Sequence, residues 1–345
     1  MFPVAQSGGS ASQAVGLASG RVGHTRTMTA LSSVRDRVDR WQQRHASLGF
    51  PIAVVRKHGD DAGGRHAALM TYYGFLSLFP IMLLAVVIVS RVLTNFPSVR
   101  AQVVKALVPF QFRGTLDYAL ASLPDGGIAL WAGLIGLVGT SVGVVLTAHD
   151  TLNQVAGVPH RLRASGLAKY LRVLAALVVL LVGIIALAAV TVQAVRLSAP
   201  DGLDTRATAV ELAAAILILF AMVWLGATLL LPRRPRLRST WPMALGGAVA
   251  ITALLAFGAL LLPALVMRAG PIYGAFAAIV GLFSFISLIA QALVWTAEVA
   301  SVRHHRLWPR SLDAANPIEA DAKALRMLAR EQERIPSQRV TSEVG

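Results

Sequence analysis

A long stretch without a single charged residue constrains this chain more than any other feature. It runs from Ala67 to Ser90, with the sequence AALMTYYGFLSLFPIMLLAVVIVS. At about 1.5 Å per residue, a helix of this length crosses a bilayer hydrocarbon core of roughly 30 Å. Polar residues and a central Pro80 interrupt the stretch, and a simple anchor would not need them. We therefore predict a transmembrane helix here with a role beyond anchoring.

Five further apolar segments follow along the chain. They cover about 128–146 (continuing as a helix to about 155), 171–195, 209–231, 243–266 and 273–299. Each fits the roughly 19 to 25 residues that a membrane-spanning helix needs. Only 14% of the residues are charged, whereas soluble domains are about a quarter charged. The predicted fold class is all-α: a polytopic integral membrane protein with six transmembrane helices plus interfacial and cytoplasmic helices.

The flanking segments predict four regions. Residues 1–28 are expected to form a disordered cytoplasmic tail, and residues 29–66 an amphipathic cytoplasmic or interfacial helix, ended by Gly49 and Pro51, with a linker. Residues 67–300 form the transmembrane domain, with interfacial helices around 97–110. Residues 301–345 are a basic, polar cytoplasmic tail that contains one exposed helix over 317–333.

Basic residues predict the orientation. Of the 32 Lys and Arg residues, 25 fall on the side that holds both termini and 7 on the other. Lys and Arg accumulate in cytoplasmic loops, so both termini are predicted to be cytoplasmic. The net charge of +15 is then explained by loops facing an anionic leaflet rather than by nucleic-acid binding.

Motifs for chemistry are missing from the sequence. There is no cysteine, and the eight histidines are scattered. No P-loop, GxSxG or HExxH pattern occurs. We expect no enzymatic activity, no metal site and no cofactor. A membrane-bound hydrolase or ribonuclease is the weakest alternative, because it would need clustered carboxylates or histidines.

Polar side chains in three spans fall on single helical faces at about 100° per residue. The candidate residues are His66, Tyr73, Ser77 and Pro80 on the first span, Thr147, Asp150, Asn153 and Gln154 on the second, and Ser284, Gln291 and Glu298 on the sixth. Polar residues in a span usually face the bundle interior or a watery cavity. They either line a substrate path or form interhelical hydrogen bonds, typically worth about 0.6 kcal/mol, that lock the bundle.

Asp150 and Glu298 both lie near the predicted cytoplasmic end of their spans. Because buried charges need partners, we expect Glu298 to pair with one of Arg65, Lys169 or Arg172. Such a cluster would form a vestibule in which cations attract an anionic head group.

Several of these segments resemble one family. AALMTYYGFLSLFP resembles AAALAYYxLFSLFP, the first-span signature of the YihY/BrkB family of bacterial inner-membrane proteins, and GFPIAVVRKHGDDAGGRHAAL resembles its YhjD-like branch. DTLNQVAGV resembles ALNRIWGV, and the last span, YGAFAAIVGLF…ALVWTAEVA, resembles YGALGAVILLL…LLGAEL. The resemblance implies six spans, cytoplasmic termini and a role in envelope integrity, in the direction of lipid export. It also implies that the older family label, ribonuclease BN, is a misassignment.

Two functions remain open. In the first, the protein transports or organises an anionic lipid or other amphiphile, with membrane lipids and envelope proteins as partners. In the second, it is a non-transporting envelope scaffold. A cavity lined by Tyr73, Asp150, Gln291 and Glu298 would favour the first, and a dry, tightly packed bundle would favour the second.

Overall fold

The computed structural model describes residues 37, 39–42, 46–92, 127–197, 205–232, 237–268, 270–313 and 316–342. Three expected features lie outside these residues: the tail over 1–28, most of the helix over 29–48, and the interfacial helices around 97–110.

The described residues form helices and no strand. Six of the helices contain segments long and apolar enough to cross a membrane. They are α3 (Gly63–Val92), α6 (Gly127–Val155), α7 (Gly166–Leu197), α8 (Thr205–Leu230), α9 (Leu237–Arg268) and α10 (Gly270–His305). The predicted all-α, six-span fold class is confirmed. α3 begins before its expected span and α10 continues well beyond its expected end, because polar residues extend both helices past the apolar core.

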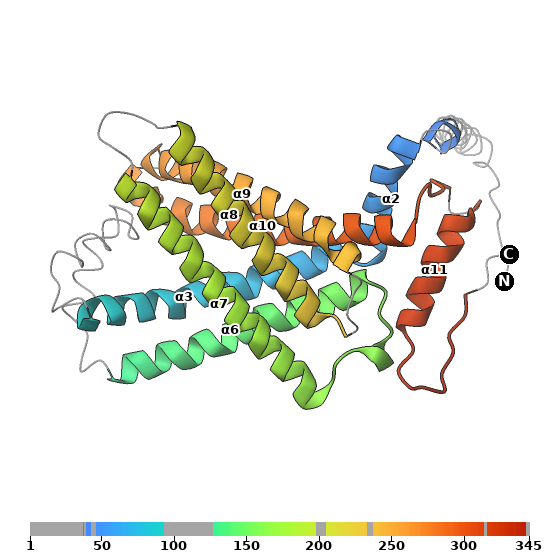
Figure 1. The fold of residues 1–345 in the computed structure, drawn as a ribbon, viewed down its shortest axis with the longest axis horizontal. Helices are drawn as coiled ribbons and strands as arrows, with labels where there is room; N and C mark the ends of the chain where they lie inside the picture. The colour runs from blue at the N-terminus through green and yellow to red at the C-terminus, as the bar shows by residue number, and fades with distance from the viewer. Residues whose placement is uncertain are drawn as a thin grey trace, which may run out of the picture.

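The six long helices pack in chain order, and α10 closes the arrangement against α3 (Figure 1). α6 also contacts α8 and α10. Small side chains make this close approach possible, as is common where helices meet in a membrane. The buried alanines at these contacts are Ala67, Ala176, Ala227, Ala244, Ala248, Ala290, Ala297 and Ala300.

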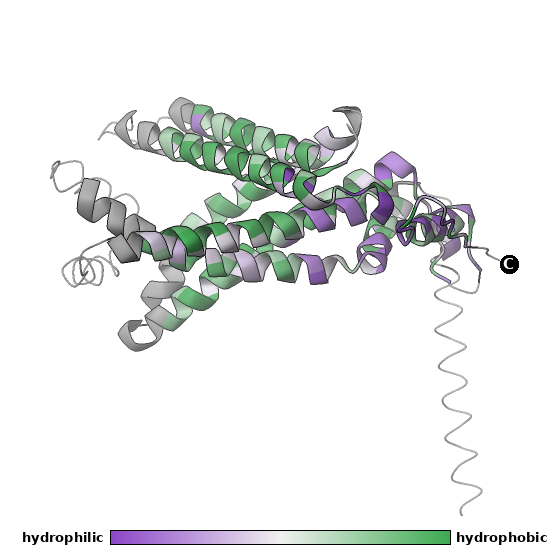
Figure 2. Ribbon diagram, turned by 90° about the horizontal axis from the view of Figure 1, so that it is seen from below, coloured by the Kyte–Doolittle hydropathy of each residue, from purple (hydrophilic) through white to green (hydrophobic). Residues whose placement is uncertain are grey.

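Two shorter helices lie at one end of the bundle, α2 (Ala46–Asp60) and α11 (Glu319–Glu331) (Figure 1). The 3-10 turn η2 (His160–Leu162) joins α6 to α7 at the same end. Hydrophilic residues gather there (Figure 2), and we call it the charged end. α2 packs on α10 and α3. It runs through Gly49 and Pro51, so the prediction that these residues end a helix is wrong.

The C-terminal helix is not the exposed helix that was predicted. In α11, Asp321, Ala324 and Glu331 are buried. Ala324 joins a core cluster with Ala53 of α2 and Leu307 just after α10. α11 therefore completes the packing of the charged end, because the apolar faces of α2 and of the end of α10 offer it a surface.

Candidate functional site

A buried charge cluster joins α2 to α10. The Lys57 ammonium forms an ion pair and a hydrogen bond with Asp61 one turn later, and its Nζ lies 3.5 Å from Oε2 of Glu298. The three residues are only 5%, 2% and 0% exposed, respectively. Both oxygens of Glu298 lack a hydrogen-bond partner among the described residues. Burial raises the pKa of the Asp61 carboxyl above its usual value, although Lys57 opposes this.

Apolar and aromatic contacts hold α2 in place around this cluster. The ring of His58 stacks on Trp295 of α10 at 4.1 Å between centroids. Burial lowers the pKa of His58 more than the nearby Asp61 raises it. The lowered pKa favours the neutral ring. Ala53 packs in one cluster with Val302 and Leu307. The neighbouring face of α2 is thus apolar, and Lys57 and Asp61 are enclosed beside it.

A second network joins α11 to α2. Arg310 donates from Nε to Asp321 at 2.8 Å and from Nη1 to Asp60 at 2.6 Å. Asp321 also accepts the backbone N–H of Ser311 at 2.8 Å and that of Ile318 at 3.2 Å. Burial opposes ionisation, but Arg310 and the backbone N–H groups hold the pKa of Asp321 below its usual value. Asp321 is therefore an ionised, fully partnered carboxylate.

The turn after α6 receives the other end of α11. Arg163 donates to Glu331, and Arg161 Nε donates to Glu333 at 2.9 Å. Gly157 has φ +63°, and a Cβ there would lie 2.7 Å from Met327 of α11. Only glycine meets both requirements. Burial raises the pKa of Glu331 to about 7, because the effect of burial is larger than the lowering effect of Arg163.

This raised pKa predicts that α11 docks more weakly as pH rises. Between about pH 4.5 and about pH 7, docked Glu331 holds a proton that the undocked carboxyl has released, so docking loses stability across this window, by on the order of 1 to 3 kcal/mol. The chain has no cysteine, so the buried Ala324 can be replaced by a single cysteine, Ala324→Cys, as a thiol-labelling probe. Its labelling rate should rise with pH relative to that of Leu325→Cys, the exposed neighbour on the same helix.

The control for this prediction is Glu331→Gln, which mimics the protonated acid. In that background the labelling ratio of the two cysteines should not change between about pH 5 and about pH 8. An unchanged ratio in the otherwise native protein would contradict the prediction.

The predicted faces of the first and second spans do meet. His66 Nε2 lies 3.0 Å from Oε1 of Gln154. Further along, the Tyr73 ring lies so close to Gly143 that a Cβ there would be 2.5 Å from Cδ1 of the ring. A Cβ at Gly136 would lie 3.3 Å from the Cβ of Pro80. The two helices are therefore packed tightly along this line.

The hydroxyl groups on these two faces bond to their own helices. Ser77 donates to the carbonyl of Gly74 at 2.6 Å, and Thr147 donates to the carbonyl of Gly143 at 2.9 Å. Their donor capacity is used locally. These contacts favour the interpretation of the α3–α6 faces as a packed interface.

Asp150 forms a group separate from Glu298. Lys169 Nζ lies 3.1 Å from Asp150, and the buried His149 lies 3.0 Å from the same oxygen. Asn153 is fully buried and donates to the carbonyl of His149 at 2.7 Å and to that of Leu230 on α8 at 3.3 Å. This amide therefore ties α6 to the end of α8.

The expected partners of Glu298 were wrong. Lys57 is its ion-pair partner, whereas Lys169 pairs with Asp150. Arg172 donates to the carbonyl of Leu231 at 3.2 Å, and Arg65 is exposed. The acids and bases do gather at one end of the bundle, but it is Lys57 of α2 that lies beside Glu298 of α10.

The three predicted residues of α10 differ in exposure. Ser284 and Gln291 are exposed, and only Glu298 is buried.

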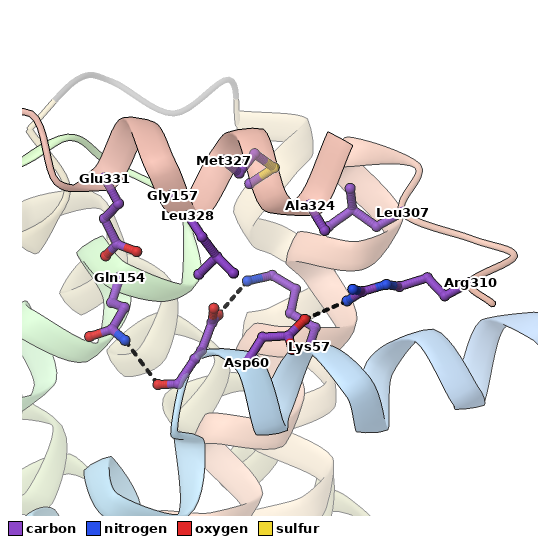
Figure 3. A pocket seen from close by; sticks show the side chains of 11 residues that line it. Lys57, Asp60, Gln154, Gly157, Leu307, Arg310, Ala324, Met327, Leu328 and Glu331 are labelled. Atoms are coloured by element: carbon purple, nitrogen blue, oxygen red, sulfur yellow. Dashed lines mark hydrogen bonds and ion pairs between the residues drawn. The ribbon is translucent and has the colours of Figure 1, made fainter. Parts of the chain in front are cut away.

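Two cavities open at the charged end. A small one of about 10 Å³, room for about one water molecule, is lined by Lys57, Asp61, Gln154, Arg310 and Glu331, among others (Figure 3).

The other cavity has about 660 Å³ and lies between the ends of α6, α8, α9 and α10. Its walls include Leu152, Val155 and Met243, and its polar groups include Thr240 and His305. Neither cavity is lined by Tyr73, Asp150, Gln291 or Glu298.

Several of the residues that shape the charged end were not predicted from the sequence: Lys57, Asp61, Arg310, Asp321 and Glu331. A signal existed for the first pair, because Lys57 and Asp61 are four residues apart and continue the spacing of the buried Ala53. The glycine-rich sequence over 59–64 is typical of a turn, and the chain does turn at Asp61 and Ala62, but α2 continues as a helix as far as Asp60.

Comparison with known proteins adds one assignment. No curated protein and no solved structure matches the chain. The family model for virulence factor BrkB matches residues 54–319. The match begins within α2 and ends at the start of α11, so it includes all six apolar helices and the Lys57–Asp61–Glu298 cluster. The chain therefore belongs to the virulence factor BrkB family.

Proposed function

We propose that this protein is an inner-membrane protein that binds an anionic lipid or similar amphiphile at its charged end and moves or organises it in the service of envelope integrity. The observation that carries the proposal is the cavity of about 660 Å³ between α6, α8, α9 and α10. Its volume is in the range of small-molecule sites, which are mostly apolar with a few placed polar groups.

The chemistry of the cavity suits an amphiphile. Leu152, Val155 and Met243 offer an apolar wall for acyl chains. Thr240 is 5% exposed, and its Oγ1 has no hydrogen-bond partner among the described residues. It lies in the first turn of α9, where free backbone N–H groups and the helix dipole favour an anion. His304 and His305 of α10 also line the cavity.

The charge of this end supports an anionic ligand on the cytoplasmic side. Four arginines, Arg233, Arg234, Arg236 and Arg238, occur in the sequence around the start of α9. Each basic residue near an anionic leaflet contributes about 1 kcal/mol of attraction. We place the charged end in the cytoplasm on the same ground, because basic loops remain on that side.

Lipid crosslinking tests the proposal. The full-length protein is reconstituted in vesicles that contain photoactivatable phosphatidylglycerol or, for comparison, photoactivatable phosphatidylcholine. We expect crosslinks from phosphatidylglycerol to fall within 231–243 and 297–305. Ala300→Trp, which fills the cavity, should lower crosslinking by at least about tenfold, equivalent to ~1.4 kcal/mol. The matched control is Ala189→Trp on the exposed face of α7, which should have no effect.

A transport assay then separates moving from organising. Fluorescent phosphatidylglycerol should change leaflet in vesicles with the native protein and not in those with Ala300→Trp. Equal crosslinking of the two lipids, or crosslinks that Ala300→Trp leaves intact, would refute the amphiphile site.

The scaffold remains the second candidate, because the α3–α6 faces are packed closely. Tyr73 fills the space over Gly143, and the hydroxyls of Ser77 and Thr147 bond to their own helices. A scaffold without a lipid site would crosslink phosphatidylglycerol and phosphatidylcholine equally and would move neither between leaflets.

A further inference from the structure

The cluster of Lys57, Asp61 and Glu298 holds one cation for two carboxylates. All three groups are almost completely removed from solvent. A buried charge without a partner is costly, and buried acids take up a proton instead of remaining ionised. With both acids ionised the cluster would carry a net negative charge. One proton makes it neutral.

We propose that Asp61 and Glu298 share a single exchangeable proton, which makes the cluster a proton-binding site at the charged end. The orphaned oxygens of Glu298 support this arrangement, because a protonated Glu298 becomes a donor and Asp61 is the neighbouring acceptor. Lys57 then neutralises the one charge that remains. The pKa of Asp61, which burial raises despite the nearby ammonium, agrees with a carboxyl pair that retains a proton.

The surrounding charged groups do not supply a second cation. On α2, Asp60 pairs with Arg310, and burial lowers the pKa of His58, which favours its neutral form. From α6, Gln154 donates to the backbone carbonyl of Asp61 at 2.9 Å and also contacts His66 of α3. Glu331 of α11 pairs with Arg163. His305 of α10 is close enough to Lys57 for the two side chains to interact electrostatically. Within the described part of the chain, Lys57 alone forms ion pairs with the two acids.

The small cavity gives the proton a way to exchange. Lys57, Asp61 and Glu331 all line it (Figure 3). It has room for about one water molecule between these groups. Since the pKa of Glu331 is about 7, this carboxyl is suited to pass protons between the cavity and solvent near neutral pH.

Infrared spectroscopy of the full-length protein in vesicles tests the proton count. The spectra are recorded in the Glu331→Gln background, because Glu331, with a pKa of about 7, would itself show a protonated-acid band near neutral pH. In that background we expect a carbonyl band of a protonated carboxylic acid near about pH 7, shifted in heavy water, and lost when Glu298→Gln or Asp61→Asn is added. The matched control is Asp321→Asn, which removes a buried carboxylate that has its own guanidinium and should leave the band unchanged. Lys57→Met should enlarge the band, because without the cation both acids need a proton.

The proposal fails if the Glu331→Gln protein has no such band, or if the band survives in either Glu298→Gln or Asp61→Asn. It also fails if the band does not shift in heavy water, since the proton would then not exchange. The Glu331→Gln protein alone decides the first and last of these outcomes, so the test does not depend on folding of a variant that alters the cluster. The result is also independent of the amphiphile cavity, which shares neither Asp61 nor Glu298.

Discussion

Replacing Lys57 with methionine is expected to lower the stability of the protein more than any other single change at the charged end. The variant leaves Asp61 and Glu298 buried without a cation. Removing one partner of a buried ion pair typically costs about 3 to 5 kcal/mol. The apparent melting temperature in detergent should fall by several degrees, and the loss should be smaller at lower pH, where both acids can be protonated.

Arg56→Met is the matched control for this prediction. Arg56 is the preceding residue on α2, its ion pair with Asp321 is longer, at 3.6 Å, and the Arg56 side chain is 30% exposed. Pairs of that kind contribute about 0 to 1 kcal/mol. If the two variants lose the same stability, the Lys57 cluster is not the buried link that holds α2 to α10.

Replacing Arg310 with methionine is expected to undock α11. Arg310 is 3% exposed and bridges Asp60 of α2 to Asp321 of α11. Without it, Asp321 keeps its two backbone donors and the more distant Arg56, so we expect a cost toward the lower end of about 3 to 5 kcal/mol. The cysteine of Ala324→Cys should become labelled at nearly the rate of Leu325→Cys.

A second substitution distinguishes a charge effect from lost packing. The double variant Arg310→Met and Asp321→Leu removes the buried carboxylate together with its cation. Docking of α11 should therefore recover in part. Arg303→Met, an exposed arginine on α10, is the control and should leave labelling unchanged. If the double variant is no better than Arg310→Met alone, the guanidinium acts through packing and not through its charge.

The predicted faces of the first two spans illustrate how far sequence periodicity reaches. His66, Tyr73 and Pro80 recur at helical spacing and do lie against the corresponding face of α6. The 100° step of a helix places residues on a face without any knowledge of the fold. It could not show whether the space between the faces is open, because that depends on how closely the tyrosine ring approaches Gly143.

For Glu298, the sequence predicted burial but not the ion-pair partner. Its burial was predictable, since an acid within an apolar segment must face the protein interior. Its partner was not, because α2 lies far from α10 in the sequence and reaches Glu298 only by packing on α10 at the end of the bundle. The same holds for α11, whose polar residues suggested an exposed helix although Asp321 and Glu331 are buried in ion pairs.

The sequence by itself determined the six membrane-spanning helices, their order and the gathering of charge at one end. Those properties follow from the cost of burying charge in a bilayer and from the length of each apolar segment. Only the tertiary structure decided which charges meet, where the cavity of about 660 Å³ lies and how α2 and α11 close the end. Such contacts depend on distances between segments far apart in the chain, and local periodicity carries no information about those distances.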